Sequence, residues 1–129
     1  MYQALDHVAI RVKDLDVAVA SYEKLGFKLE RRGLVESLGI KQAIFPLGDS
    51  GGFIEIVEPT NPDLAVGRAL SRYGEGIHTI ALVVDDVNET ASNLKSQGVN
   101  IIGPEGDGGV AFIHPREAYG VLFQLVQRS

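Results

Sequence analysis

Two similar pairs of polar residues constrain the fold of this chain more than any other feature. His7 and His78 each stand near the start of a short apolar run, and each is followed by a polar residue inside another such run. Glu55 comes 48 residues after His7, and Gln124 comes 46 residues after His78. Burying an imidazole, a carboxylate or an amide is costly unless the group is paired. Four such groups in a two-fold pattern predict a common partner, and one metal ion is the simplest partner.

The apolar pattern between these residues also occurs twice. Residues 15–25 and 87–97 carry apolar or small residues at i, i+3, i+4 and i+7, which predicts two amphipathic helices. Asp14 and Asp86 precede these segments as expected N-caps. The predicted strands are residues 4–12, 27–32, 41–47, 52–58, 77–84, 99–102, 109–114 and 120–127. A strand, a helix and further strands are therefore expected to occur twice.

Length and spacing together predict one domain, residues 1–129, made of two modules. Module 1 is expected at about 1–60 and module 2 at about 75–129, because the repeat offset is near 70 residues. A linker at about 61–74 separates them, and the pattern within it at 63–73 predicts a short helix. A chain of 129 residues with 45% hydrophobic residues is long enough to bury a single core without disulfides.

Composition excludes several classes of partner. The formal net charge is −5 and the basic residues are scattered, so no nucleic-acid partner is expected. There is no cysteine, which excludes disulfides and thiolate ligands. Neither a signal peptide nor an apolar run of membrane-spanning length is present, so we expect no membrane association and a cytoplasmic location.

Strand alternation predicts which side chains converge. Residues two apart on a strand share a face, so Arg11 lies on the face of His7 and could point into the same cavity. There it would hold an anionic part of a substrate away from the reacting atoms. Glu58 and Gln127 have the opposite strand parity to Glu55 and Gln124, so we expect them to be exposed.

Several short motifs carry a family resemblance that covers nearly the whole chain. They are Asp6-His7-Val8-Ala9-Ile10, Phe45-Pro46-Leu47-Gly48-Asp49, Ile54-Glu55-Ile56-Val57-Glu58-Pro59, Gly74-Glu75-Gly76-Ile77-His78, Ala111-Phe112-Ile113-His114-Pro115 and Gly120-Val121-Leu122. In this order they resemble the vicinal oxygen chelate superfamily of glyoxalases, bleomycin-resistance proteins and dioxygenases, and among its branches the methylmalonyl-CoA epimerases. The resemblance implies an α+β fold in which two tandem βαβββ modules form an open eight-stranded barrel around a divalent metal, usually in a homodimer.

The resemblance also implies a set of metal ligands. Carried over by position, they are His7, Glu55, His78 and Gln124. Gln124 departs from the family, where a glutamate serves as both ligand and base, because an amide cannot take a proton at neutral pH. Arg11 is a second departure from the epimerases, although bacterial glyoxalase I resembles this chain in having an arginine there for a substrate carboxylate. Thr79 is a third, since epimerases often have a second histidine at that position.

The remaining candidate residues concern proton transfer and substrate binding. Glu36 and Glu55 are the candidate catalytic carboxylates, since one base of the family's pair is missing. His114 is either a structural residue near a turn or a substrate contact, and Arg116 is either a solvated residue or an anion contact. Imidazole and oxygen ligands suit Co, Ni, Zn, Mn or Fe, without a choice among them.

Three functions are compatible with these residues. The first is a metal-dependent isomerase or lyase acting through a chelated enolate, like methylmalonyl-CoA epimerase or glyoxalase I. Its substrate would be a small anion, such as an acyl-CoA or a thiol adduct. The second is an iron(II)-dependent dioxygenase, because two histidines and a carboxylate also satisfy the facial-triad pattern. The third is a binding or resistance protein without catalysis, a class that normally lacks the metal ligands.

Overall fold

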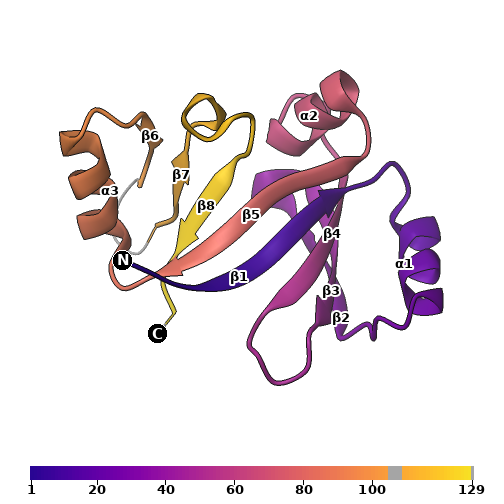
Figure 1. Cartoon of the computed structure of the whole chain (residues 1–129). Helices are drawn as coiled ribbons and strands as arrows, with labels where there is room; N and C mark the ends of the chain where they lie inside the picture. Colours follow the sequence, from indigo (N-terminus) through magenta and orange to yellow (C-terminus); the bar gives the residue numbers. More distant parts are fainter. Residues whose placement is uncertain (105–108, 129) are drawn as a thin grey trace. The chain divides into compact units, whose positions relative to one another are not determined.

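A computed structural model describes residues 1–104 and 109–128 and shows an α+β architecture (Figure 1). The helices and strands, in chain order, are β1 (Tyr2–Arg11), α1 (Leu15–Lys24), β2 (Arg31–Val35), β3 (Ile40–Pro46), β4 (Phe53–Pro59), α2 (Ala65–Tyr73), β5 (Gly76–Val84), α3 (Val87–Ser96), β6 (Ile101–Ile102), β7 (Ala111–Ile113) and β8 (Phe123–Val126). Two short 3₁₀ turns, Glu36–Leu38 and Pro115–Ala118, complete the described structure. Part of the predicted strand at 109–114 is confirmed, whereas residues 105–108 before it lie outside the described residues.

The strands form one eight-stranded sheet, as the family resemblance predicted. Its hydrogen-bonding order is β2-β3-β4-β1-β5-β8-β7-β6. Within the described residues β2 has only β3 as a neighbour and β6 has only β7, so the sheet is not closed into a barrel. The predicted α+β fold with eight strands in an open arrangement is thus confirmed in these features. No helix in residues 1–104 or 109–128 is long and apolar enough to cross a membrane.

The chain divides into two compact units whose limits differ from those of the predicted modules. Unit 1 consists of Met1–His7 and Thr79–Ser129, and unit 2 consists of Val8–His78. The strands β1 and β5 each contribute residues to both units. The first seven residues therefore belong with the second half of the chain, and the division into tandem modules stays a prediction.

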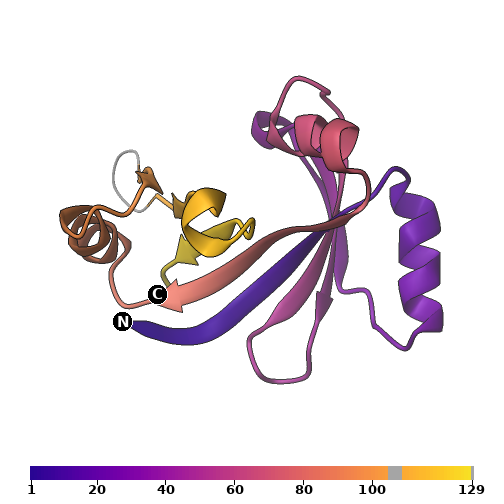
Figure 2. The same cartoon turned by 45° about the horizontal axis from the view of Figure 1, so that its top comes forward.

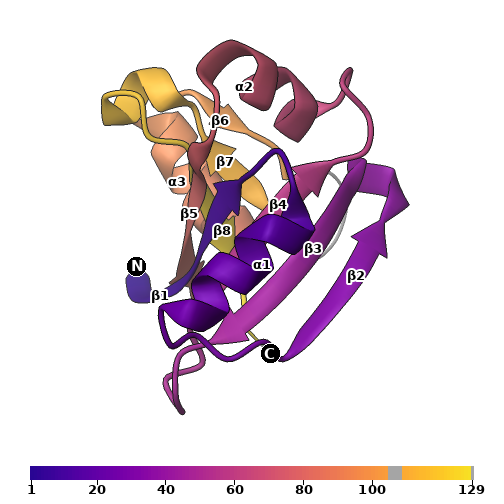
Figure 3. The same cartoon turned by 90° about the vertical axis from the view of Figure 1, so that its right-hand side faces the viewer.

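In unit 2, α1 packs on one face of β3 and β4 (Figure 3). The buried core residues there are Val12, Leu15, Ala18, Val19, Ala43, Phe45 and Ile56. Three aromatic rings strengthen this cluster: Tyr22 lies 5.2 Å from Phe27 and 5.9 Å from Phe45 between ring centroids. The helix forms where the sequence predicted it, since its buried residues recur at helical spacing behind the Asp14 cap.

Helix α2 lies on a different side of these strands from α1 (Figure 2). Its Val66 packs with Ile40 and Val57, and Val57 alternates with Ile56 on β4, whose side chain faces α1. The contact of α2 with the preceding segment requires a glycine at position 67. A Cβ atom on Gly67 would lie 2.4 Å from the carbonyl oxygen of Asn61, which is closer than real contacts allow.

In unit 1, α3 packs on β5, β7 and β8 through an aliphatic core. The buried residues are Val84, Val87, Ala91, Ala111 and Leu125, joined at the edge by Leu82, Leu94, Ile101 and Ile113. Leu82 and Val84 belong to this core, which identifies the face of β5 that α3 covers. Residues of the opposite parity, from Thr79 to Val83, therefore lie on the other face.

The first turns of α1 and α3 are held in the same way. Asp14 caps α1 by accepting a hydrogen bond from the backbone N–H of Val17, and Asp86 caps α3 by accepting one from Glu89. A second acceptor reaches the first residue of each helix. Glu58 Oε1 accepts from the N–H of Leu15 at 2.8 Å, and Gln127 Oε1 accepts from the N–H of Val87 at 3.0 Å.

Candidate functional site

His7 is buried on β1 and is oriented by its neighbour in the chain. Its side chain is 9% exposed, and its Nδ1 lies 2.8 Å from Asp6 Oδ2. The other carboxylate oxygen of Asp6 accepts a hydrogen bond from Nε of Arg128 at 3.0 Å. A carboxylate beside Nδ1 favours the proton on that nitrogen, which makes Nε2 the lone-pair nitrogen of a neutral ring. This arrangement suits a metal ligand or a general base.

Gln124 and Thr79 lie on one face of unit 1. β8 runs parallel to β5, and Gln124 is the register partner of Ala81. Register partners on neighbouring strands point to the same side of the sheet, so Gln124 and Ala81 share a face. Thr79 precedes Ala81 by two residues on β5 and therefore lies on that face as well. Thr79 is buried there, with 5% of its surface exposed. His78 has the parity of Leu82, so the alternation of β5 directs it to the opposite face.

A hydrogen bond within unit 1 links the start of β1 to the end of β5. Nε2 of Gln3 donates to Oδ1 of Asp85, a residue that directly follows β5.

In unit 2, Glu55 lies on the face of β4 that points away from α1. Its neighbours Ile54 and Ile56 pack in the α1 core, so alternation turns Glu55 to the other side, where its register partner is Ile44. The carboxylate is half-buried. The role of Glu55 as a metal ligand or base stays a prediction.

Arg11 is buried on the predicted face of β1, with 9% of its surface exposed. Its Nε donates to the carbonyl oxygen of Gly74, and its NH1 donates to that of Ile77, both at 2.8 Å. Its guanidinium carbon lies 5.7 Å from the ring centroid of Tyr73. These contacts tie β1 to the end of α2 and the start of β5. They are structural contacts, and binding of a substrate anion by Arg11 stays a prediction.

His78 is half-buried near the start of β5. Burial, and to a lesser extent the positive charge of Arg11, lower the pKa of His78 below its ordinary value of 6.5. Its Nδ1 is buried and has no hydrogen-bond partner among the described residues. An unpaired buried nitrogen of this kind costs stability and calls for an explanation.

The other predicted residues lie on turns. Glu36 begins the exposed 3₁₀ turn Glu36–Leu38 that follows β2. His114 accepts a hydrogen bond through Nδ1 from the backbone N–H of Arg116 at 3.0 Å and so caps the turn Pro115–Ala118. This hydrogen bond agrees with the structural role near a turn, one of the two roles that the sequence offered for His114. Arg116 itself is exposed. Their roles toward a substrate stay predictions.

The predicted metal ligands are distributed over both units, with His7 and Gln124 in unit 1 and Glu55 and His78 in unit 2. Across residues 1–104 and 109–128, no three side chains of His, Cys, Asp or Glu are grouped so that they could hold an ion. His78 has the opposite parity on β5 to Ala81, the register partner of Gln124. The four-ligand set stays a prediction.

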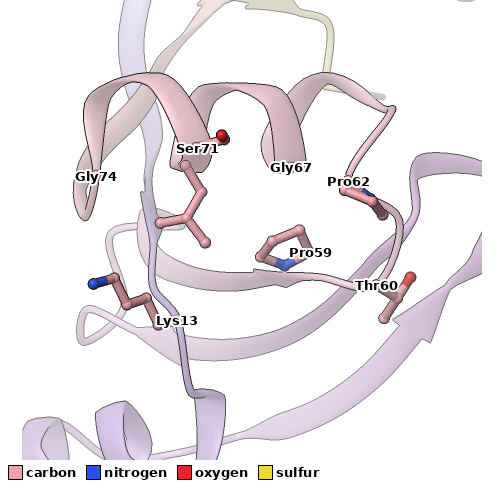
Figure 4. A pocket seen from close by; sticks show the side chains of 8 residues that line it. Lys13, Pro59, Thr60, Pro62, Gly67, Ser71 and Gly74 are labelled. Atoms are coloured by element: carbon pink, nitrogen blue, oxygen red, sulfur yellow. The ribbon is translucent and has the colours of Figure 1, made fainter.

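A pocket of about 550 Å³ lies in unit 2, and none of the predicted site residues belongs to its lining. Figure 4 shows α2 above it and the end of β4 below, with Lys13 at one side. Its lining consists of Lys13, Pro59, Thr60, Pro62, Gly67, Leu70, Ser71 and Gly74. Few polar groups converge in it, which gives it no chemistry comparable to that of the His7 and Glu55 faces.

Comparison with known proteins decides the family. The glyoxalase-like domain matches residues 5–123. The chain belongs to the glyoxalase-like family. Mitochondrial methylmalonyl-CoA epimerase of Homo sapiens is 30% identical over 95% of this chain and 73% of its own length. The resemblance to the vicinal oxygen chelate superfamily is thereby confirmed.

Solved structures agree with this assignment. Methylmalonyl-CoA epimerase of Mycobacterium tuberculosis has a TM-score of 0.86 and 33% identity, covering 99% of this chain and 89% of that one. A variant of the Streptomyces coelicolor epimerase, in complex with 2-nitronate-propionyl-CoA, has a TM-score of 0.88 and 31% identity, covering 100% and 96%. These relatives are enzymes, which confirms the prediction that the chain is an enzyme of this superfamily.

Proposed function

We propose that the chain moves the proton on the α-carbon of a 2-substituted malonyl-CoA thioester, as methylmalonyl-CoA epimerases do. The observation that carries the proposal is the full-length similarity to an epimerase that binds 2-nitronate-propionyl-CoA. A nitronate is planar and negatively charged next to the thioester, so it resembles the enolate formed when the α-proton leaves. A site built for such an anion stabilises the reaction's intermediate.

The polar side chains of the candidate site differ in their ability to accept a proton. Glu55 carries a carboxylate, which can accept the α-proton, whereas the Gln124 amide can only donate or accept hydrogen bonds. We assign proton abstraction to Glu55. Glu36 is the candidate for returning a proton on the other side of the substrate. His7, held by Asp6, presents a lone pair at Nε2, which can accept a proton or a hydrogen bond but cannot donate to the thioester oxygen.

The metal-dependent and lyase alternatives have less support. The superfamily resemblance implies one divalent ion, but the described residues lack the required group of three donors, so we route no step through an ion. The same finding weighs against the iron(II) dioxygenase, which needs two histidines and a carboxylate together. A glyoxalase-type lyase, a homodimer and a cytoplasmic location stay predictions.

Exchange of the α-proton with solvent deuterium tests the proposal. The purified full chain is incubated with methylmalonyl-CoA in D₂O, and loss of the α-proton is followed by NMR. We expect exchange in the wild type and a loss of about 10²–10⁴-fold in Glu55→Gln, because that is the usual contribution of a general base. Gln124→Glu should raise the exchange rate by adding an acceptor.

Gln127→Glu is the matched control for the last variant. It makes the same chemical change three residues further along, at a position where Oε1 accepts the N–H of Val87 and a carboxylate oxygen can do the same. Its exchange rate should equal that of the wild type. If the wild type exchanges at ordinary enzymatic rates and Gln124→Glu changes nothing, the base lies elsewhere, with Glu36 first to be tested.

A second candidate function is binding of an acyl-CoA without turnover. It is favoured by the amide at position 124 and by the absence, among the described residues, of a three-donor metal group. Calorimetric binding of methylmalonyl-CoA without any deuterium exchange would select this function over the epimerase.

A further inference from the structure

The two strand–helix segments of the chain correspond with an offset of 72 positions. Asp14 caps α1 and Asp86 caps α3, and the helices begin at Leu15 and Val87. The buried residues of α1 at Leu15, Ala18 and Val19 recur in α3 at Val87, Thr90 and Ala91. At the ends of the preceding strands, Val12 and Val84 occupy equivalent places in the two helix-covered cores.

The same offset relates the polar residues on the strands. Counting back from the caps, the counterpart of His7 is Thr79, and the counterpart of Asp6 is His78. Burial follows this correspondence, because His7 and Thr79 are both buried while Asp6 and His78 are both intermediate. The two histidines therefore stand at positions that differ by one residue, and a shift of one residue on a strand reverses the face.

The strand register within unit 1 adds a third donor independently of the repeat. Gln124 is paired with Ala81, which places it on the face of Thr79. By the correspondence of β1 and β5, the donors that face the same side in unit 1 are the His7 imidazole, the Thr79 hydroxyl and the Gln124 amide.

We infer that Thr79, and not His78, occupies the second histidine position of the site, and that the chain consequently does not hold a divalent ion tightly. A neutral hydroxyl and a neutral amide are weak ligands for the transition metals that imidazole and carboxylate bind. Of the three donors in unit 1, only the His7 imidazole is a strong ligand. This inference concerns metal binding alone and does not depend on the proposed catalytic activity.

Restoring a strong ligand at position 79 tests the inference. Thr79→Cys is nearly isosteric, and its thiolate is a strong ligand for Co²⁺ and Zn²⁺. The natural chain has no cysteine, so a sulfur-to-cobalt charge-transfer absorption could arise only from this position. We expect no stoichiometric Co²⁺ in the wild type and an affinity at least about 100-fold higher in Thr79→Cys, since even indirect supports of a metal site change affinity by 10–100-fold.

Two further variants keep the result decisive. Thr79→His should raise Co²⁺ affinity in the same direction, whereas Ile80→Cys, on the opposite face of β5, should give no charge-transfer band. Elemental analysis of the wild type, purified without chelator, needs no variant at all. One tightly held ion per wild-type chain that disappears in His78→Gln and persists in Thr79→Val would overturn the inference.

Discussion

The segment that leads into α1 and the segment that leads into α3 are supported by the same kinds of contact. Each helix has an aspartate at its N-cap, Asp14 or Asp86, and a second side chain from a neighbouring strand on its first N–H. That second residue is Glu58 in one case and Gln127 in the other. A carboxylate and an amide are interchangeable here because only an acceptor oxygen is required.

The same exchange is not neutral among the residues proposed for chemistry. Glu55 and Gln124 also differ as carboxylate and amide, but only the carboxylate can accept a proton. His7 and Thr79 differ even more, since only the imidazole is a strong metal ligand or base. The supporting contacts of the two segments are thus repeated, whereas the chemistry is concentrated on His7 and Glu55.

The cores of the two segments differ in kind. The α1 core contains a tilted group of aromatic rings around Phe45, and the α3 core is aliphatic. Phe45 and Leu125 are both fully buried. The comparison predicts that unit 2 depends more strongly on a single side chain than unit 1 does.

The largest expected effect therefore belongs to Phe45→Ala. It should lower the free energy of unfolding by about 3–5 kcal/mol, because it removes a large buried ring and the contacts with Tyr22 and Phe27. Leu125→Ala should lower the free energy of unfolding by less, toward the lower end of the roughly 2–5 kcal/mol that truncation of a buried leucine costs. Urea unfolding followed by far-UV circular dichroism measures both. A larger loss in Leu125→Ala would contradict the contrast.

The N-caps should, in contrast, contribute equally. Asp14→Ala and Asp86→Ala each remove one acceptor from a first helical turn, so each should lower the free energy of unfolding by about 1 kcal/mol. Glu23→Ala, an exposed change within α1, is the control and should stay within about 0.5 kcal/mol of the wild type. Unequal costs for the two aspartates would show that the segments are supported differently.

Much of the fold could be predicted because helices and caps are local features. The helices expected at 15–25 and 87–97 are confirmed as Leu15–Lys24 and Val87–Ser96. The strand expected at 27–32 was wrong, because β2 runs from Arg31 to Val35. Phe27 and Leu29 produced the apolar alternation, yet they pack against the α1 core before the strand begins. The edge strand itself is mostly exposed and carries no apolar signal.

The candidate site was harder to predict because it depends on register between distant strands. Alternation correctly placed Arg11 and His7 on one buried face of β1. It could not show that Gln124 pairs with Ala81, since pairing between β8 and β5 is set by tertiary contacts. A usable signal was nevertheless present: counting back from the caps Asp14 and Asp86, and not between the histidines, matches His7 with Thr79. The side chains of Glu58 and Gln127 were expected only to be exposed. No sequence pattern indicated that they accept backbone N–H groups of the helices.

The smallest expected effect concerns the pair of equivalent positions Asp6 and His78. Asp6 is paired with His7 and Arg128, whereas the buried Nδ1 of His78 has no partner among the described residues. Burial and then the charge of Arg11 lower the pKa of His78 in the folded chain below 6.5. The unfolded chain consequently binds a proton at a higher pH than the folded chain, so His78 should favour unfolding as the pH falls below about 6.5 and down through its lowered folded pKa.

Above this window His78 is neutral in both states and the stability is fully present. His78→Gln should therefore flatten the fall in the free energy of unfolding between pH 7 and pH 5, measured by urea titration at each pH. His114→Gln serves as the control, because the Nδ1 of His114 already accepts a backbone N–H, and the slope should persist in that variant. A steeper dependence of the unfolding free energy on pH in His78→Gln would contradict this prediction. It would mean that the folded chain stabilises the protonated form of His78.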